Sequence, residues 1–454
     1  METSLHPTAS AMSYEEASAY LGSLQFFRIK LGLDTMRQLL QELGAPQERL
    51  RVIHIAGTNG KGSVGATLRT LLTQAGYRAG FYSSPHLVDV RERFTLDGAL
   101  ISKDDFAAQM SMLRALFART GLQATYFECT TLLALNWFAG QQVDVAILET
   151  GLGGRLDATN LVRPMVSVIT DISRDHEQYL GADIKSIAAE KAGIIKAGVP
   201  VVFSGRSAGA VEVIEDFCTR LGSTLYLLGR DFFANHGGQD GESGDGLLNY
   251  TGIHGQSWQQ LPLALPGAHQ VVNASLALAA LDLLTDTFPI SAEDIRAGLA
   301  RVRWPGRMEY IGVGIGVGQA QGRRQFLLEG AHNEAGVQAL CVNLRSREAG
   351  RRMVLVWGNM ADKDMGSIRR ELFAMAALII LTQAENERSA TPQALWQTLN
   401  DEEREKTCCI VPAEDALRAA MTSTTEADLI CVAGSLYLVG RARNFLVPEN
   451  EAAA

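Results

Sequence analysis

A glycine-rich turn between an apolar run and a helical pattern most constrains how this 454-residue chain can fold. Residues 51–56 form an apolar run with β-branched side chains, which is typical of a buried strand. The turn that follows reads Gly57-Thr58-Asn59-Gly60-Lys61-Gly62-Ser63, and apolar residues then recur at helical spacing over residues 64–75. A strand, a glycine-rich turn and a helix in this order predict an open α/β sheet with an anion site where the helix begins.

This turn has the residue types of a phosphate-binding loop. Backbone N–H groups and the helix dipole favour an anion at a helix start, and glycines let the backbone approach phosphate oxygens. Lys61 would bring a positive charge to the outer phosphates, and Ser63 a hydroxyl near the metal. The spacing departs from the general P-loop, because Gly57 and Gly60 enclose two residues where that loop has four. An ordinary loop is the alternative, but the flanking strand and helix favour a nucleoside triphosphate site.

Composition and charge exclude several classes of protein. With 47% hydrophobic and 20% charged residues the chain has a globular composition, and its length predicts more than one domain. A formal net charge of −9 argues against nucleic-acid or membrane-surface binding, which requires an extended basic face. Apolar runs such as residues 374–381 are too short to span a bilayer. The six cysteines include no C-x-x-C pair, which indicates reduced, buried thiols in a cytoplasmic protein.

Strand-like runs alternate with helical patterns in two series, which predicts parallel sheets covered by helices. The first series has strands at residues 51–56, 79–83, 143–149, 166–170 and 199–204. A Gly- and Asp-rich loop or hairpin insertion at 229–260 and a long helix at 268–286 follow. The second series has strands at residues 325–328, 353–357, 378–381 and 429–433. We therefore expect a P-loop-type parallel-sheet ATPase domain over residues 1–302 and a smaller Rossmann-like α/β domain over 303–454.

Residues 312–318 alternate glycine with β-branched residues and superficially match a dinucleotide-binding fingerprint. Strict alternation is typical of a strand, and no helix start follows directly. We therefore predict a strand here and no nicotinamide site.

Polar clusters follow the expected strands of the first domain. They are Ser83-Ser84-Pro85-His86, residues 149–157 and residues 171–176, with Glu190-Lys191 on the next helix. Because ligands bind at the carboxyl ends of strands in open α/β sheets, these groups should converge. Glu149 offers the hard oxygen ligand that Mg²⁺ prefers. Taken singly, such residues are more often structural or solvated, and their convergence is what favours a functional site.

The motifs, in this order, resemble those of the folylpolyglutamate synthase/dihydrofolate synthase family of the Mur-type amide ligases, in its bifunctional bacterial form. In the first series the resemblance is carried by residues 57–63, 83–87, 149–160, 175–181 and 190–196. In the second half it is carried by residues 269–273, 304–309, 330–333, 362–364 and 434–437. It covers nearly the whole chain.

The resemblance implies a role for each matching residue. Lys61, Lys191, carried as a carbamate, and His176 match the catalytic groups. The magnesium ligands, expected to hold two ions, are Ser84, Glu149 and His176, so that Ser84 displaces Ser63 as the metal hydroxyl. ATP would be bound by Thr58, Asn59, Gly60, Lys61, Gly62, Ser63, Asn273, Arg307, Glu329 and His332. The pterin side would comprise Lys30, Leu31, Gly32, Thr125, Phe127, Glu128, Leu156, Asp157 and Ala158.

Two expectations concern individual side chains. On the pterin side, Asp157 would accept hydrogen bonds from an amino-pyrimidine ring, and Phe127 would pack on a flat heterocycle. In the second domain this chain has Glu329 where the family usually has Asp, and Glu334 where it often has Pro. The carboxylate at position 329 therefore reaches one methylene further.

The implied reaction is ATP-dependent addition of L-glutamate to dihydropteroate or a reduced folate through an acyl phosphate. We expect a cytoplasmic monomer with small-molecule substrates and no nucleic-acid or membrane partner. One alternative is another Mur-type amide ligase acting on peptidoglycan precursors, against which residues 125–128 and 156–158 argue. The other is a non-catalytic nucleotide- or folate-binding relative, for which Glu329 is the only hint. Whether one ligase activity or both are present stays open, and the pterin-side residues favour both.

Overall fold

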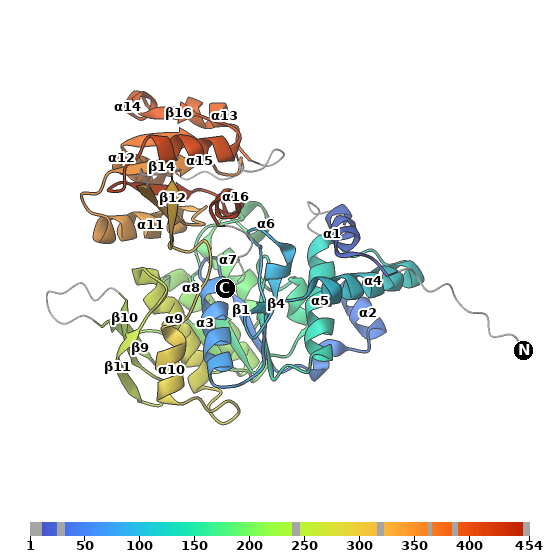
Figure 1. Ribbon diagram of the computed structural model, residues 1–454. Coiled ribbons are helices and arrows are strands. Elements are labelled where there is room, and N and C mark those ends of the chain that lie inside the picture. Colours follow the sequence, from blue (N-terminus) through green and yellow to red (C-terminus); the bar gives the residue numbers. More distant parts are fainter. Residues whose placement is uncertain are drawn as a thin grey trace, which may run out of the picture.

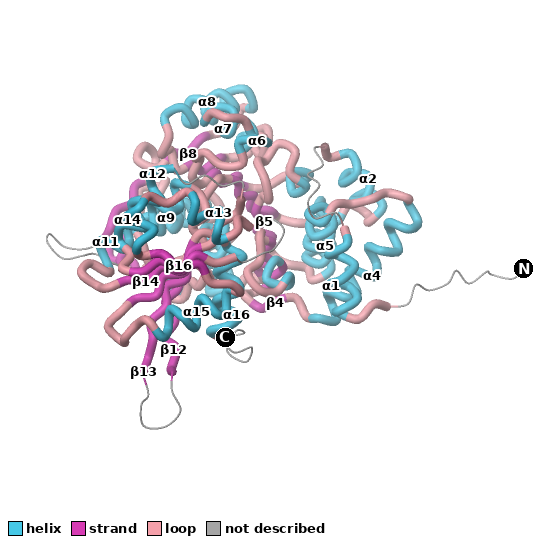
Figure 2. The backbone as a smooth tube through the Cα atoms, turned by 90° about the horizontal axis from the view of Figure 1, so that it is seen from above, coloured by secondary structure: helices cyan, strands magenta, loops and turns pink. Residues whose placement is uncertain are grey.

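The computed structural model describes residues 11–24, 32–237, 246–315, 322–361, 366–383 and 389–447. Two large sheets, each with helices against it, lie one above the other, and a small third sheet lies beside the lower one (Figure 1). Seen from above, strands β12, β13 and β14 of the C-terminal sheet lie on the left of the molecule, and helices α1, α2, α4 and α5 lie on the right (Figure 2).

The first sheet has the strand order β4-β3-β2-β5-β1-β6-β7-β8. Strands β2, β5, β1, β6, β7 and β8 are parallel, and β3 and β4 add an antiparallel edge. The strands are β1 (Val52–Ala56), β2 (Ala79–Tyr82), β3 (Phe94–Leu96), β4 (Ala99–Leu100), β5 (Val145–Glu149), β6 (Val166–Ile169), β7 (Val201–Phe203) and β8 (Leu225–Leu227). The parallel sheet is as predicted, and all five expected strands are present. The short β3, β4 and β8 were not predicted, because two or three residues carry too little periodicity.

Helices cover both faces of this sheet because successive side chains of its strands point to opposite sides. Ile53 and Ile55 of β1 pack in the core shared with α3, α9 and α10, whereas Val52 packs in the core shared with α1, α2, α4 and α5. The helices of this part are α1 (Tyr14–Ser23), α2 (Asp34–Glu42), α3 (Lys61–Gln74), α4 (Lys103–Thr120), α5 (Tyr126–Gly140), α6 (Glu177–Leu180), α7 (Ile184–Ala192), α8 (Ala208–Leu221), α9 (Ala268–Asp282) and α10 (Ala292–Leu299).

The predicted insertion folds into a three-stranded antiparallel sheet of order β11-β10-β9. Its strands are β9 (Phe233–His236), β10 (Leu247–Thr251) and β11 (Ser257–Pro262). The hydroxyl of Tyr250 on β10 donates a 2.6 Å hydrogen bond to Oδ2 of Asp282 on α9. This buried bond ties the small sheet to the helix that reaches the cleft.

The second large sheet has the order β12-β13-β17-β14-β15-β16, parallel except for β12. Its strands are β12 (Glu309–Ile315), β13 (Gly322–Leu328), β14 (Met353–Trp357), β15 (Leu378–Leu381), β16 (Thr407–Cys409) and β17 (Leu429–Ala433). Its helices are α11 (Glu334–Arg347), α12 (Gly366–Met375), α13 (Pro392–Gln397), α14 (Asp401–Glu405), α15 (Ala413–Thr422) and α16 (Leu436–Leu446). The alternating glycines up to residue 315 lie in β12, as predicted, and residues 316–318 lie outside the described part of the chain.

One expectation from the sequence is wrong. Cys408 and Cys409 are exposed, although the other four cysteines are buried as expected, and all six are free thiols. The reason is topological, because β16 is an edge strand of its sheet. Among the described residues, no helix combines the length and the apolar character that crossing a membrane requires.

Candidate active site

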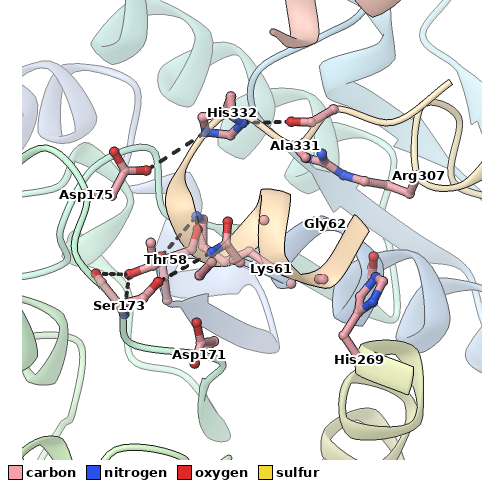
Figure 3. A pocket seen from close by; sticks show the side chains of 18 of the residues that line it. Thr58, Lys61, Gly62, Asp171, Ser173, Asp175, His269, Arg307, Ala331 and His332 are labelled. Carbon is pink, nitrogen blue, oxygen red and sulfur yellow. Dashed lines mark hydrogen bonds and ion pairs between the residues drawn. The ribbon is translucent and has the colours of Figure 1, made fainter. Parts of the chain in front are cut away.

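The turn between β1 and α3 presents the start of α3 to the cleft. Gly60 is the residue before the helix, has φ 91°, and provides no side-chain cap, so the first N–H groups of α3 face outward without one. This positive φ explains the glycine, because L side chains rarely adopt it, and a Cβ here would in addition meet the side-chain oxygen of Asn273. Thr58 fixes the turn from below, since its N–H donates to the carbonyl of Asp171 and its hydroxyl to that of Ser173 (Figure 3). The turn is therefore preshaped for an anion.

Lys61 and Glu149 face each other across this turn. The ammonium of Lys61 donates to the carbonyl oxygens of Gly57 and Thr58 at 3.0 and 3.1 Å, and lies 4.0 Å from Oε1 of Glu149. Glu149 ends β5, is 4% exposed, and accepts a 3.4 Å hydrogen bond from the Ser84 N–H. Burial raises the pKa of Glu149 to about 7 in spite of Lys61. A buried carboxylate with so little compensation suits a bound cation.

Lys191, on α7, lines the same space and is 3% exposed. Its ammonium forms no hydrogen bond or ion pair with the other described residues. Burial, followed by repulsion from Lys61, lowers the pKa of Lys191 to about 7. Near neutral pH a substantial fraction of this lysine is therefore the uncharged amine, which has a free lone pair.

His176 follows the sharp turn after β6 in a left-handed conformation, with φ 52°. Its N–H donates to Oδ1 of Asp175 at 2.8 Å. The other oxygen of Asp175 lies 3.9 Å from Nε2 of His332, which belongs to the second domain (Figure 3). Nδ1 of His332 is 2.8 Å from the carbonyl oxygen of Gly330, which orients the ring. The two domains thus meet at the predicted metal and nucleotide residues.

Glu329 and Arg307 form the opposite wall. Nη1 of Arg307 lies 3.7 Å from Oε1 of Glu329, and Oε2 of Glu329 accepts a 2.8 Å hydrogen bond from the Met308 N–H. Burial raises the pKa of Glu329. The longer side chain at position 329 therefore bridges Arg307 and the backbone at Met308, which has a positive φ of 47°.

These groups line one cavity of about 700 Å³ between the two domains. The structure brings together all ten residues predicted for ATP, the three predicted for magnesium, and Lys191. It adds residues that sequence reasoning did not single out, including Arg206 after β7 and Asn343 on α11. Arg206 could have been predicted as a site residue, because it follows the end of a strand. Nothing in the sequence around Asn343 indicates that it lines the cavity.

The pterin-side residues lie behind this cavity. Phe127 backs its wall, because a Cβ on the lining residue Gly151 would come within 2.5 Å of the Phe127 ring. Thr125 caps α5, and Glu128 completes a capping box by accepting from the Thr125 N–H at 2.8 Å. Ala158 is buried and Leu156 half-buried beside them. Gly32 is described with φ 136°, while Lys30 and Leu31 lie outside the described residues.

The Asp157 carboxylate holds the glycine-rich turn that follows Glu149. Oδ2 accepts from the N–H groups of Gly151 and Leu152 at 2.8 and 2.9 Å, and Oδ1 accepts from the N–H and the hydroxyl of Thr159 at 3.0 and 2.6 Å. Four donors occupy the acceptor positions of this carboxylate. Its binding to a heterocycle stays a prediction, and these contacts assign it a structural role.

Gly62 provides a test of how the nucleotide loop is supported. A Cβ on Gly62 would lie 2.6 Å from Nε1 of Trp304, in the segment joining the domains. We expect Gly62→Ala to raise the KM for ATP about tenfold, because overpacking must displace either the indole or the loop. Gly209→Ala, where a Cβ would meet only Lys185 at 3.8 Å, is the matched control. Recovery in Gly62→Ala/Trp304→Leu would trace the effect to this contact, and an unchanged KM in the single variant would contradict it.

Two family profiles match the chain. The Mur ligase middle domain matches residues 55–281, and the Mur ligase glutamate ligase domain matches residues 306–436. The structure has a parallel sheet with a nucleotide loop, and this sheet faces a second α/β domain across a cleft. Together with the two profile matches, this arrangement defines an ATP-dependent ligase of the Mur type.

Individual relatives narrow this class. The chain is 32% identical to dihydrofolate synthase/folylpolyglutamate synthase of Bacillus subtilis over 96% of this chain and 99% of the relative. Its structure matches Mycobacterium tuberculosis folylpolyglutamate synthase complexed with ADP and AMPPCP with a TM-score of 0.85, 29% identity and coverage of 96% and 99%. It matches Escherichia coli FolC in complex with DHPP and ADP with a TM-score of 0.82, 31% identity and coverage of 96% and 98%. The chain belongs to the dihydrofolate synthase/folylpolyglutamate synthase family, as its motifs indicate.

Proposed function

We propose that the protein ligates L-glutamate to both dihydropteroate and reduced folates, with conversion of ATP to ADP and phosphate. The observation that carries the proposal is the shared cavity, in which the nucleotide loop, Glu149 and Lys191 face Arg307 and His332. Relatives named for both activities, matched over nearly their whole length, support the bifunctional form. We further propose that it acts as a cytoplasmic monomer, with neither nucleic acid nor membrane as a partner.

The chemistry requires several anions to be held together. An oxygen of the acceptor carboxylate attacks the γ-phosphorus of ATP, ADP leaves, and an acyl phosphate forms. The glutamate nitrogen then bonds to the acyl carbon, the amine loses a proton, and phosphate departs as the amide closes. Lys61, Arg307 and the N–H groups at the start of α3 would stabilise the negative charge in both steps.

Magnesium fits this cleft. Among the described residues no three His, Cys, Asp or Glu side chains form a metal-binding cluster. Mg²⁺ nevertheless needs only one or two protein carboxylates when phosphate and water complete its shell. Glu149, with Ser84 and His176, would hold the two expected ions, and the buried, weakly compensated carboxylate of Glu149 supports this assignment. When bound, the ions supply positive charge to the phosphates.

Lys191 would be carried as a carbamate. The ammonium first loses one proton. The lone pair of the neutral amine then bonds to the carbon of CO₂ and a second proton is released, so that a buried cation becomes an anion. Three features support this proposal: the burial of Lys191, the lack of a hydrogen bond or ion pair between its ammonium and the described residues, and its pKa of about 7. An anion at this position could also meet a bound metal ion, which an ammonium would repel.

The domain boundary is proposed at residue 303. The eight-stranded sheet ends before it and the six-stranded sheet begins after it, which supports a hinge at residues 303–305. Closure about this hinge would bring glutamate to the acceptor and keep water from the acyl phosphate.

A glutamate-dependent ADP-release assay tests the proposal, with dihydropteroate and tetrahydrofolate offered separately. We expect turnover with each acceptor and none without glutamate. Turnover with only one acceptor would limit the protein to a single activity. Turnover of a nucleotide-linked muramyl acceptor alone would assign it to another Mur-type reaction, and tight ATP binding without phosphate release would make it a non-catalytic relative.

A further inference from the structure

Two asparagines pair across the boundary between the domains. Nδ2 of Asn333 donates to Oδ1 of Asn59 at 3.0 Å, and Nδ2 of Asn59 donates to Oδ1 of Asn333 at 3.2 Å. Asn59 belongs to the nucleotide loop, and Asn333 is the residue that caps α11 of the second domain. The pair therefore joins the nucleotide loop of the first domain to the N-terminus of α11 in the second domain.

Asp175 completes this junction. Nδ2 of Asn333 also donates to Oδ2 of Asp175 at 3.0 Å, and Nε2 of His332 lies 3.9 Å from the same oxygen (Figure 3). Oδ1 of Asn333 accepts from the Gly336 N–H at 2.9 Å, which is the helix cap. A single amide, only 4% exposed, thus contacts the nucleotide loop, the segment after β6 and its own helix.

The nucleotide loop is held from the other side as well. Trp304, between the domains, lies against Gly62 and its ring centroid is 5.5 Å from that of Phe81 on β2. The loop therefore contacts the interdomain segment at one end and the second domain at the other. A rotation of the second domain would break the Asn59–Asn333 pair and replace its two hydrogen bonds by bonds to water, so the docked state would lose their net stabilisation.

We propose that Asn333 is a positioning residue that couples docking of the second domain to the shape of the nucleotide loop. Within its own domain, the amide of Asn59 donates a long hydrogen bond of 3.4 Å from Nδ2 to Oγ of Ser173. Docking adds the shorter bond that Oδ1 of Asn59 accepts from Asn333, so nucleotide binding and domain docking stabilise each other. The kinetic part of this inference rests on the proposed ligase function, whereas the docking part does not.

Asn333→Asp isolates the coupling from the helix cap. Aspartate caps a helix as well as asparagine does, but the substitution replaces both N–H donors by an oxygen facing Asp175 and Asn59. We expect a folded protein with a wider separation of labels on the two domains in the presence of ADP, and a kcat lower by about tenfold. Asn400→Asp, at the cap of α14 in the same domain, is the matched control and should change none of these.

An exchanged pair gives the decisive comparison. In Asp175→Asn/Asn333→Asp, the new amide at position 175 can still accept from the His176 N–H and can donate to the new carboxylate at position 333. We expect the label separation and kcat to return to within about threefold of the parent. Asn333→Asp with parental label separation, or an exchanged pair no better than the single variant, would overturn the coupling. Absence of ligation in the parent would instead count against the proposed function, because the label separation is measured with ADP alone.

Discussion

Lys191→Ala is expected to lower glutamate-dependent ADP release by about a thousandfold while leaving the fold intact. The reason is that the carbamate would be the charged group opposite the metal ligands, and alanine can form none. Stability should rise and not fall, because the parent buries an ammonium that is 3% exposed and forms no hydrogen bond or ion pair with the described residues. ¹³C NMR after incubation with labelled bicarbonate should show a carbamate signal in the parent and none in the variant.

The pH dependence gives this prediction a second readout. The pKa of Lys191 falls from 10.5 to about 7 in the fold, so the folded state binds this proton less tightly than the unfolded chain. Its contribution to stability is therefore present above pH 10.5 and is lost as the pH falls through about 7. Without bicarbonate, the stability gained by Lys191→Ala should be larger at pH 6 than at pH 9, as measured by denaturant unfolding.

Lys185→Ala is the matched control on the same helix. Lys185 is exposed and pairs with Glu212 on the surface, an interaction that contributes little. This variant should keep both the carbamate signal and the ligase rate. A Lys191→Ala enzyme that turns over at nearly the parental rate would contradict the carbamate assignment.

The sequence predicted the elements whose residues carry a strong local signal. Buried strands such as β14 and β17 read as uninterrupted apolar runs, and their bounds were found at the residues predicted. The cleft could also be predicted from the sequence. Ser84, Glu149 and residues 171–176 follow the ends of predicted strands, and the carboxyl ends of parallel strands lie at one edge of the sheet. Membership of the family rested on the order of many motifs.

What the sequence did not reveal depends on contacts between distant residues. Nothing in the local pattern around Asn59 or Asn333 indicates that their amides pair across 274 positions. Glu128 and Asp157 match substrate-side positions by motif, yet their carboxylates hold a helix cap and a turn. The exposure of Cys408 and Cys409 follows from the place of β16 at a sheet edge, which is set by the order of strands and not by the strand's own composition.

The other large effect is expected at Glu149. We expect Glu149→Gln to lower ADP release by about a thousandfold, because the amide keeps the shape of the side chain but loses the charge that would hold Mg²⁺. Addition of MgCl₂ with ADP should raise the thermal midpoint of the parent more than that of the variant. Glu212→Gln, on an exposed carboxylate, should respond like the parent. Equal midpoint gains and equal rates in parent and Glu149→Gln would remove Glu149 from the metal site.

The same substitution should stabilise the metal-free protein, in a direction fixed by the pKa of Glu149. Burial raises that pKa from 4.5 to about 7, so the carboxyl's contribution to stability is full below pH 4.5 and is lost as the pH rises through about 7. At pH 8 the parent therefore carries a desolvated charge worth at most about 3 kcal/mol, which glutamine avoids. We expect Glu149→Gln to be more stable than the parent at pH 8, to lose this advantage near pH 4, and to lose ligation. These results together would show that the buried charge of Glu149 serves to bind a cation and does not stabilise the fold.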